Sequence, residues 1–237
     1  MTYCLAIKVR KGIVALADTR ITSGTETTIA KKYYTHMGKK QALFLMTSGL
    51  RSVRDKALTY FKEVIEHDES FTKLYQAANA LGKEIKRAAN EDKDSLKDSG
   101  LNFNLHTILG GQLAEDEEPK VFMIYPEGNR IELGEGSPFI IIGNSGYGKP
   151  VLRRTISVDS SMEMALKSGF LSFDSTRVSA NDVDFPIDVI IYENDSYDFK
   201  IRRFELDEMF EISRMWGEKL KESIESIPND WMKKILD

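Results

Sequence analysis

The chain has 237 residues, 41% of them hydrophobic and 30% charged, so it is long enough to bury a sizeable core. Its 33 basic and 37 acidic residues give a net charge of −4, which argues against a nucleic-acid surface, because phosphate binding needs a concentrated basic face. The sequence has neither an apolar run of the roughly 20 residues that span a bilayer nor a secretory signal at its start. We therefore expect a cytoplasmic domain that binds neither nucleic acid nor membrane.

The sequence has too few cysteines for internal disulfides and too few histidines for a histidine-rich metal centre. Cys4 is the one cysteine, which excludes an internal disulfide framework, and three scattered histidines argue against a histidine-rich metal centre. Because Cys4 falls in a predicted strand, we expect it to pack in the core and not to act as a nucleophile. We expect no metal and no organic cofactor.

The first part of the chain is predicted to form strands. Residues 4–20 alternate apolar and polar positions on both sides of Lys11 and Gly12, which is typical of a hairpin with a tight turn. Residues 42–49 form a continuous apolar run that ends in a serine and a glycine. This run predicts a strand that is buried on both faces.

The apolar period then changes from two residues to 3.6. Apolar positions at helical spacing predict one helix over 53–65 and a second over 71–85. The charged stretch 91–98 is predicted to be a solvated loop.

Strands resume after this loop, with one helix among them. A helix is predicted over 161–169, and from Leu206 apolar residues again recur at helical spacing until Pro228 interrupts them. Strands are predicted over 104–112, 121–126, 138–143, 186–193 and 197–206.

The order of these elements points to a fold class. Strands do not alternate one by one with helices, which disfavours a doubly wound parallel sheet. The order favours an α+β fold, a four-layer αββα sandwich of two antiparallel sheets flanked by helices. The sequence contains no internal repeat, low-complexity segment or flexible linker. We expect one sandwich domain over residues 1–205, with 206–237 as a helical extension of the same domain.

Thr2 is the first candidate for chemistry. Removal of Met1 would expose a residue that carries a hydroxyl nucleophile and a free α-amine, whose ordinary pKa is about 7.7–8.0. Such an amine can act as the general base for its own hydroxyl. A small residue at position 2 is also common in cytosolic proteins, so its position alone does not establish a function.

Three further residues could assist Thr2 if it acts as a nucleophile. Asp18 ends the second predicted strand, and Lys32 stands where the third would begin. If that strand lies beside the first two, the Lys32 ammonium can approach Thr2 and lower the pKa of its amine, while Asp18 holds the ammonium in place. Gly49 would let a substrate carbonyl approach the backbone, so that its N–H forms an oxyanion hole. The alternatives are a turn or cap residue for Asp18 and a simple strand-to-helix turn for Gly49.

Taken in order, several short stretches resemble a known family. TYCLAIKV, GIVALADTR, IAKKYY and MTSG resemble the front half of the proteasome β-type subunits, which are N-terminal-nucleophile hydrolases. MTYC, LGGQ, IYPEGN, YGKP, SFDST and PIDVIIYE are similar to Anbu, the bacterial proteasome-related family. The resemblance covers residues 1 to about 200, and it implies the same αββα fold, the N-terminal-nucleophile hydrolase fold.

The resemblance implies a role for each candidate residue. Thr2 becomes the nucleophile, Lys32 tunes its amine, and Asp18 is the partner of the lysine. Lys32 is preferred to Lys31 because it stands directly before an aromatic pair. Gly49 becomes the oxyanion-hole donor.

Two more implied residues depart from the family pattern. Asp174 matches the aspartate that supports the N-terminal threonine, although a loop cap is the alternative. The serine that the family places near the amine aligns with Ser145 only after a register shift of one, and an alignment on the following proline puts Tyr147 there. The second supporting serine of the family, which follows the aspartate, is displaced as well, since Asp174 is followed by the stretch STRVS at 175–179. We therefore expect other donors to orient the amine. The glycine-rich turn around Ser145 lacks the spacing of a nucleotide-binding loop.

We therefore predict an N-terminal-threonine amide hydrolase, a peptidase that forms an acyl-enzyme at Thr2 once Met1 is removed. The resemblance also implies self-assembly into a homo-oligomeric ring or an open spiral. Two alternatives stay open, a non-catalytic scaffold like the proteasome α-type subunits and an amidase that acts on a non-peptide amide. Because only Met1 precedes Thr2, we favour the enzyme, since the α-type subunits carry an extra N-terminal helix. The helical extension either packs on its own domain or contacts a neighbouring subunit, and an unfoldase partner is left open.

Overall fold

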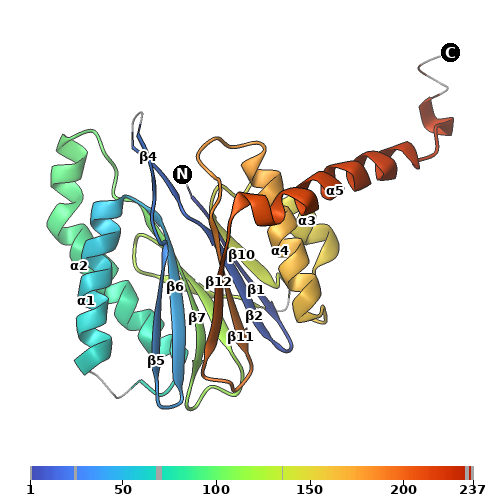
Figure 1. Ribbon diagram of the computed structural model, residues 1–237. Helices are drawn as coiled ribbons and strands as arrows, with labels where there is room; N and C mark the ends of the chain where they lie inside the picture. The colour runs from blue at the N-terminus through green and yellow to red at the C-terminus, as the bar shows by residue number, and fades with distance from the viewer. Residues whose placement is uncertain (1, 24–25, 68–70, 135, 233–234, 236–237) are drawn as a thin grey trace. The chain divides into compact units, whose positions relative to one another are not determined.

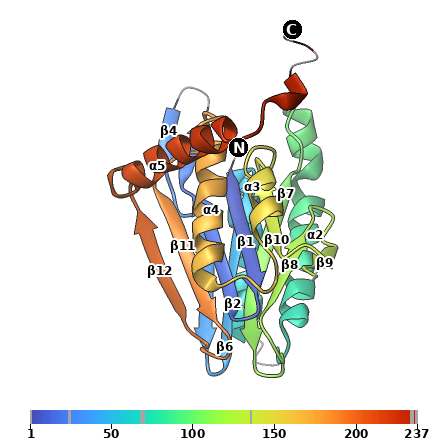
Figure 2. The ribbon, with the colours of Figure 1, turned by 90° about the vertical axis from the view of Figure 1, so that its right-hand side faces the viewer.

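The larger part of the chain is a four-layer sandwich. The computed structural model describes residues 2–23, 26–67, 71–134, 136–232 and 235. The chain divides into two compact units, Met1–Phe204 and Glu205–Asp237. In the first unit, two sheets pack face to face between pairs of helices (Figures 1 and 2). The predicted α+β class and αββα sandwich are confirmed.

The first sheet has five antiparallel strands, and the predicted N-terminal hairpin lies near its centre. Cys4 pairs with Ala17 and Val9 pairs with Gly12. Every residue of the second strand is buried, because neighbouring strands flank it and both faces of the sheet are covered. In spatial order the strands are β10 (Phe139–Gly143), β1 (Tyr3–Val9), β2 (Gly12–Asp18), β11 (Ile187–Glu193) and β12 (Phe199–Phe204).

The second sheet also has five antiparallel strands. Its β6 strand is buried from residue 42 through residue 47, as the apolar run predicts. The strand that follows Lys32 is β5, and it pairs with β6 and not with the first two strands. The condition considered for Lys32, that this strand lies beside β1 and β2, is therefore not met. In spatial order the strands are β5 (Tyr33–Gly38), β6 (Gln41–Gly49), β7 (Leu105–Leu113), β8 (Lys120–Ile124) and β9 (Arg130–Glu132).

Two pairs of helices cover the outer faces of the sheets (Figure 1). The second sheet is covered by α1 (Arg51–His67) and α2 (Leu74–Asp98), and the first by α3 (Lys149–Thr155) and α4 (Met162–Arg177). Gly169 lets α4 lie close to β2, because a Cβ at this position would come within 2.8 Å of the Leu16 side chain.

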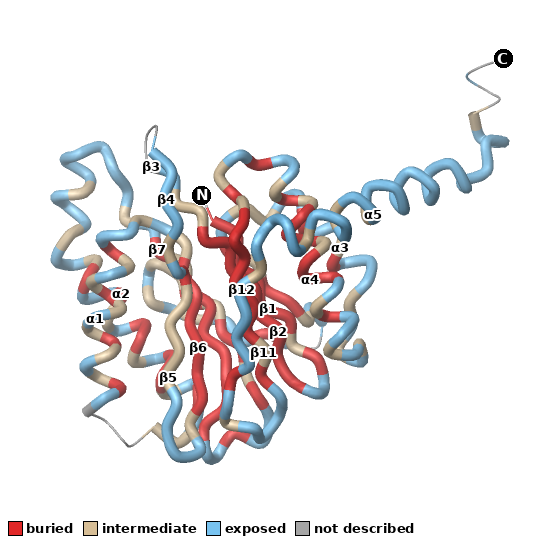
Figure 3. The backbone as a smooth tube through the Cα atoms, viewed as in Figure 1, coloured by how far each residue is buried: buried red, intermediate tan, exposed pale blue. Residues whose placement is uncertain are grey.

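Buried apolar side chains fill the space between the layers. Figure 3 marks the buried residues in red along the central strands. Between the two sheets the core contains Cys4, Ala6, Phe44, Ile108 and Tyr192. Cys4 is fully buried, which confirms its predicted place in the core. Small alanines on β1 and β2 leave room for the large side chains of the opposite sheet.

The second helix extends beyond its predicted end. Residues 91–98 form the last turns of α2, so the expected solvated loop is wrong. Lys56 on α1 pairs with Glu91 at 2.8 Å and with Asp92 at 2.7 Å, and Arg87 pairs with Glu91 one turn along α2 at 3.3 Å. These charges support the helix through pairs along it and across to α1.

Several other elements differ from the prediction. Strands β3 (Arg20–Ser23) and β4 (Glu26–Ile29) fall in the part of the chain predicted to form strands, but their pairing in a separate hairpin is not predicted. Strand β9 and helix α3 have no counterpart in the prediction. Ser161 caps the N-terminus of α4, where the helix is predicted to begin, but α4 continues to Arg177. Asp174 therefore lies inside a helix, and its alternative role as a loop cap is wrong.

The second unit is helical. It contains α5 (Leu206–Glu225), which ends before Pro228 as predicted, and the short 3-10 helix η1 (Asp230–Met232). Within the described ranges of the whole chain, no helix is both long and apolar enough to cross a membrane.

Candidate active site

Thr2 stands at the start of β1, where the end of β10 holds its backbone. The Thr2 carbonyl accepts a hydrogen bond from the N–H of Asn144 at 2.7 Å. Gly143, with φ +86°, passes so close that a Cβ there would lie 1.9 Å from the Thr2 carbonyl oxygen. Thr2 is 8% exposed. Met1 lies outside the described residues.

Asp18 joins Lys32 to the start of β1. Both carboxylate oxygens accept hydrogen bonds from Lys32 Nζ at 2.8 Å, and Oδ1 also accepts one from the backbone N–H of Tyr3 at 2.8 Å. The side chains of Asp18 and Lys32 are 0% and 3% exposed. Burial raises the pKa of Asp18 to about 6, although the charge and hydrogen bonds of Lys32 oppose the rise. At neutral pH the carboxyl is therefore mainly ionised.

The structure distinguishes the two neighbouring lysines. Lys31 is exposed, and its Nζ lies 4.0 Å from the centroid of the Tyr33 ring. Lys32 is buried, and its carbonyl accepts a hydrogen bond from the N–H of Thr47 on β6 at 3.3 Å. Of the two, Lys32 is the lysine that reaches Asp18, and it comes from the side of the second sheet.

Gly49 ends β6 with an unusual backbone. Its φ is +144°, and a Cβ would lie 1.8 Å from the Asn104 carbonyl oxygen, so only glycine fits there. The preceding residue, Ser48, lies close to β10, since a Cβ on Gly143 would come within 3.2 Å of Ser48 Oγ. The same Gly143 touches the Thr2 carbonyl. The end of β6 is thereby brought to the end of the sandwich where β1 begins.

A tyrosine and a serine that the sequence does not single out connect this end of β1 to α4. The Tyr3 hydroxyl and Ser172 Oγ are 2.6 Å apart. Gly148 packs against the same helix, since a Cβ there would lie 2.4 Å from the Ser172 carbonyl oxygen. Tyr3 lies in the part of the chain predicted to form strands, but nothing in the sequence indicates that Ser172 is its partner.

The last two candidate residues, Asp174 and Ser145, lie on α4 and in the turn after β10. Asp174 is buried in α4, and its carboxylate accepts hydrogen bonds from Arg177 at 2.8 and 3.2 Å. Ser145 follows Asn144 in the turn after β10, and it lines a cavity together with Lys149 and Arg153. The structure thus gathers Asp18 and Lys32 at the Thr2 end of β1, with Gly49 at the same end of the sandwich, and places Ser145 on the side of α3.

Metal ligands are not gathered in the part of the chain that the structure describes. There, no group of three or more His, Cys, Asp or Glu side chains is arranged to hold a metal ion. The chemistry available at this end of β1 is that of a hydroxyl, a carboxylate, an ammonium and backbone N–H groups.

A sandwich of two antiparallel sheets between two pairs of helices is the proteasome-type fold of N-terminal-nucleophile hydrolases. Solved structures place the chain more narrowly. An Anbu mutant from Hyphomicrobium sp. strain MC1 is 32% identical, with 96% of this chain and 98% of that chain covered and a TM-score of 0.88. The chain belongs to the Anbu family.

Two further solved structures are similar over nearly the whole chain. Anbu from Yersinia bercovieri, described as an ancestral β-subunit, is 28% identical with a TM-score of 0.87, and 95% of this chain and 97% of that chain are covered. A helical assembly of the Anbu complex from Pseudomonas aeruginosa is 27% identical with a TM-score of 0.88, and it has the same two coverages. No family model and no curated protein matches the chain.

Proposed function

We propose that the protein is an N-terminal-threonine hydrolase that cleaves amide bonds in peptides. One observation carries the proposal: a buried carboxylate, Asp18, holds the ammonium of Lys32 and the backbone of Tyr3 at once, directly beside Thr2. A buried charge is costly unless it is paired. A buried lysine–aspartate pair that is hydrogen-bonded to the residue after Thr2 is what an amine-assisted nucleophile needs.

The reaction starts from Thr2 as the first residue, after Met1 has been removed. The positive charge of Lys32 disfavours protonation of the Thr2 amine, so that more of it is the free base at neutral pH. The amine takes the proton of the Thr2 hydroxyl as the hydroxyl oxygen attacks the substrate carbonyl. The tetrahedral intermediate collapses when the amine returns that proton to the leaving nitrogen, which gives an ester on Thr2 and the first product. Water then attacks the ester, and the second product leaves as a carboxylic acid.

Backbone and supporting groups complete the proposal. The N–H of Gly49 stabilises the negative oxygen of the tetrahedral intermediate, and its special backbone conformation supports this role. Asp174 helps to orient the Thr2 amine from α4. We assign Ser145 to the turn that holds the Thr2 carbonyl through Asn144, and not to the amine itself.

The test is peptide hydrolysis by chains whose first residue is controlled. One preparation begins at Thr2, a second carries one extra residue ahead of Thr2, and a third begins at Thr2→Ala. A library of fluorogenic peptides should be cleaved by the first preparation alone, because only there are amine and hydroxyl on the same residue. Equal cleavage by the Thr2→Ala preparation would overturn the proposal.

We also propose that the protein assembles with copies of itself. Apolar side chains of α5 stay exposed in the single chain, among them Phe210, Met215 and Leu220. Exposed apolar residues that recur on a helix are typical of an interface, and the Pseudomonas aeruginosa relative is described as a helical assembly. Removal of 205–237 should lower the number of chains per assembly, which is the molar mass from light scattering divided by the mass of one truncated chain, and an unchanged number of chains would contradict this role for α5. A cytoplasmic location stays a prediction from the sequence.

A further inference from the structure

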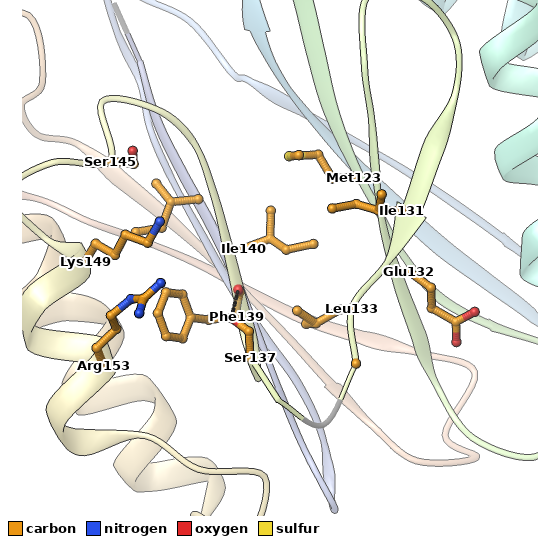
Figure 4. Close-up of a pocket in the computed structure, with 12 residues that line it drawn as sticks. Met123, Ile131, Glu132, Leu133, Ser137, Phe139, Ile140, Ser145, Lys149 and Arg153 are labelled. Atoms are coloured by element: carbon orange, nitrogen blue, oxygen red, sulfur yellow. Dashed lines mark hydrogen bonds between the residues drawn. The ribbon is translucent and has the colours of Figure 1, made fainter.

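A cavity outside the candidate active site lies between strand β10, strand β9 and helix α3. Its volume is about 260 Å³. Apolar side chains form its floor, and three of them, Leu133, Phe139 and Ile140, are almost fully buried. In Figure 4, Lys149 and Arg153 extend from α3 toward Phe139 and Ile140. The cavity thus has an apolar floor and a cationic wall.

The two cations are available to a ligand. Lys149 and Arg153 are four residues apart, so they lie on the same face of α3, one turn from each other. Among the residues that the structure describes, neither forms an ion pair. Glu132, the acidic residue that lines the cavity, is engaged by Lys120 at 2.7 Å. The positive charge at the cavity is therefore not neutralised by its described surroundings, in a chain whose net charge is −4.

We propose that this cavity binds a small carboxylate with an apolar body. The apolar part gains free energy as it leaves water and contacts Phe139 and Ile140. The carboxylate faces Lys149 and Arg153, which provide charge-assisted hydrogen bonds. Ser145 lies at the same wall and supplies a hydroxyl as a further donor.

The size of the cavity restricts the ligand. Pockets for drug-sized ligands occupy about 300–1,000 Å³, so this cavity suits a smaller molecule. Two sources share the required chemistry, the C-terminal residue of a peptide with an apolar side chain and a short-chain fatty acid. The proposal is independent of the hydrolase function, because the cavity contains neither Thr2 nor Lys32.

Binding is tested with the Thr2→Ala chain, so that no reaction at Thr2 contributes to the signal. Calorimetric titration compares octanoate with octanol, and N-acetyl-leucine with its uncharged amide. We expect one saturable site per chain for at least one carboxylate, and binding about tenfold weaker for the matching neutral molecule. A preference for octanoate would identify the fatty-acid source, and a preference for N-acetyl-leucine the peptide source.

Matched variants then locate the site. Lys149→Gln and Arg153→Gln should each weaken binding several-fold, whereas Arg154→Gln should leave it unchanged, because Arg154 is on the same helix but does not line this cavity. Melting temperatures equal to that of the parent chain show that the variants are folded. Equal binding of acids and neutral analogues, binding that is unchanged in both cavity variants, or no binding of either acid would overturn the proposal.

Discussion

Both carboxylate oxygens of Asp18 accept a hydrogen bond from Lys32 Nζ, each at 2.8 Å, and water has almost no access to either side chain. The two residues come from different sheets, since Asp18 ends β2 and Lys32 precedes β5. The pair therefore fixes the spacing of the two sheets at the end where β1 begins. Both the structure of this end and the proposed chemistry depend on it.

Replacement of Lys32 should affect activity and stability together. Lys32→Met removes the charge that lowers the pKa of the Thr2 amine, and we expect kcat/KM to fall by about 100-fold or more. It also leaves Asp18 buried without its cation, which should cost about 3 kcal/mol of unfolding free energy. Lys31→Met is the matched control, because Lys31 is exposed and should change neither quantity appreciably. Comparable losses of activity in the two variants would show that Lys32 has no special role.

The raised pKa of Asp18 predicts how stability varies with pH. An aspartate in the unfolded chain has a pKa of about 3.9, whereas that of Asp18 in the folded chain is about 6. The folded state thus binds this proton more tightly, so the stability contributed by Asp18 is fully present below the lower pKa and is lost as the pH rises through the higher one.

Comparison with Asp18→Asn, which does not titrate, isolates this contribution. The unfolding free energy of the wild type minus that of the variant should fall by about 2 kcal/mol between about pH 4 and about pH 7. Denaturant titrations at several pH values measure the difference. A difference that grows with pH would mean that Lys32 outweighs burial and lowers the pKa of Asp18.

The contact of Gly143 with Thr2 predicts a sharp contrast between two glycines of one turn. A Cβ at Gly143 would collide with the Thr2 carbonyl oxygen and would sit on a residue with positive φ, whereas a Cβ at Gly146 meets no atom within 4 Å. Gly143→Ala should therefore lower the unfolding free energy by about 3 kcal/mol or more. Gly146→Ala should change it by less than about 0.5 kcal/mol. Thermal melts of the two variants measure the contrast, and similar melting temperatures would argue against the tight packing at Thr2.

Replacement of Asp174 tests its proposed role in orienting the Thr2 amine from α4. Asp174→Asn keeps the shape of the side chain but removes its charge, and we expect kcat to fall by about tenfold. Arg177→Gln is the matched variant, because it removes the cation that pairs with Asp174 but leaves the carboxylate in place. If Asp174 served only to bind Arg177, the two variants would lower kcat equally. We expect the loss to be larger for Asp174→Asn.

The sequence predicts those helices and strands whose signal lies within one short stretch of the chain. The hairpin of β1 and β2 and helix α1 follow from the spacing of their apolar residues, and strand β6 follows from a continuous apolar run, because each of these signals lies within one short stretch of sequence. The extension of α2 over 91–98 is not predictable in this way, because Glu91 and Asp92 pair with Lys56 on α1, which is far away in the sequence. The place of β5 in the second sheet likewise depends on which strand it pairs with, and local alternation does not specify that.

The sequence predicts part of the candidate site, namely its main residues, but not the contacts that connect distant segments. Thr2, Asp18 and Lys32 are suggested by their chemistry and their order, and the family resemblance makes the suggestion specific. The Tyr3 contact with Ser172 joins residues 169 positions apart, and no local signal marks it. Asp174 is inside a helix and not in a loop, because α4 runs on past Gly169, where the apolar pattern suggests that it ends.

The central claim is that Thr2 acts as an N-terminal nucleophile, and the most direct test is the intact mass of the chain after incubation with a peptide epoxyketone. This electrophile reacts with both the hydroxyl and the amine of a terminal threonine. We predict a chain without Met1 that gains one adduct, and no adduct on Thr2→Ala or on a chain with one extra residue ahead of Thr2. A chain that begins at Thr2, is folded and gains no adduct with any of a panel of peptide epoxyketones would contradict the claim.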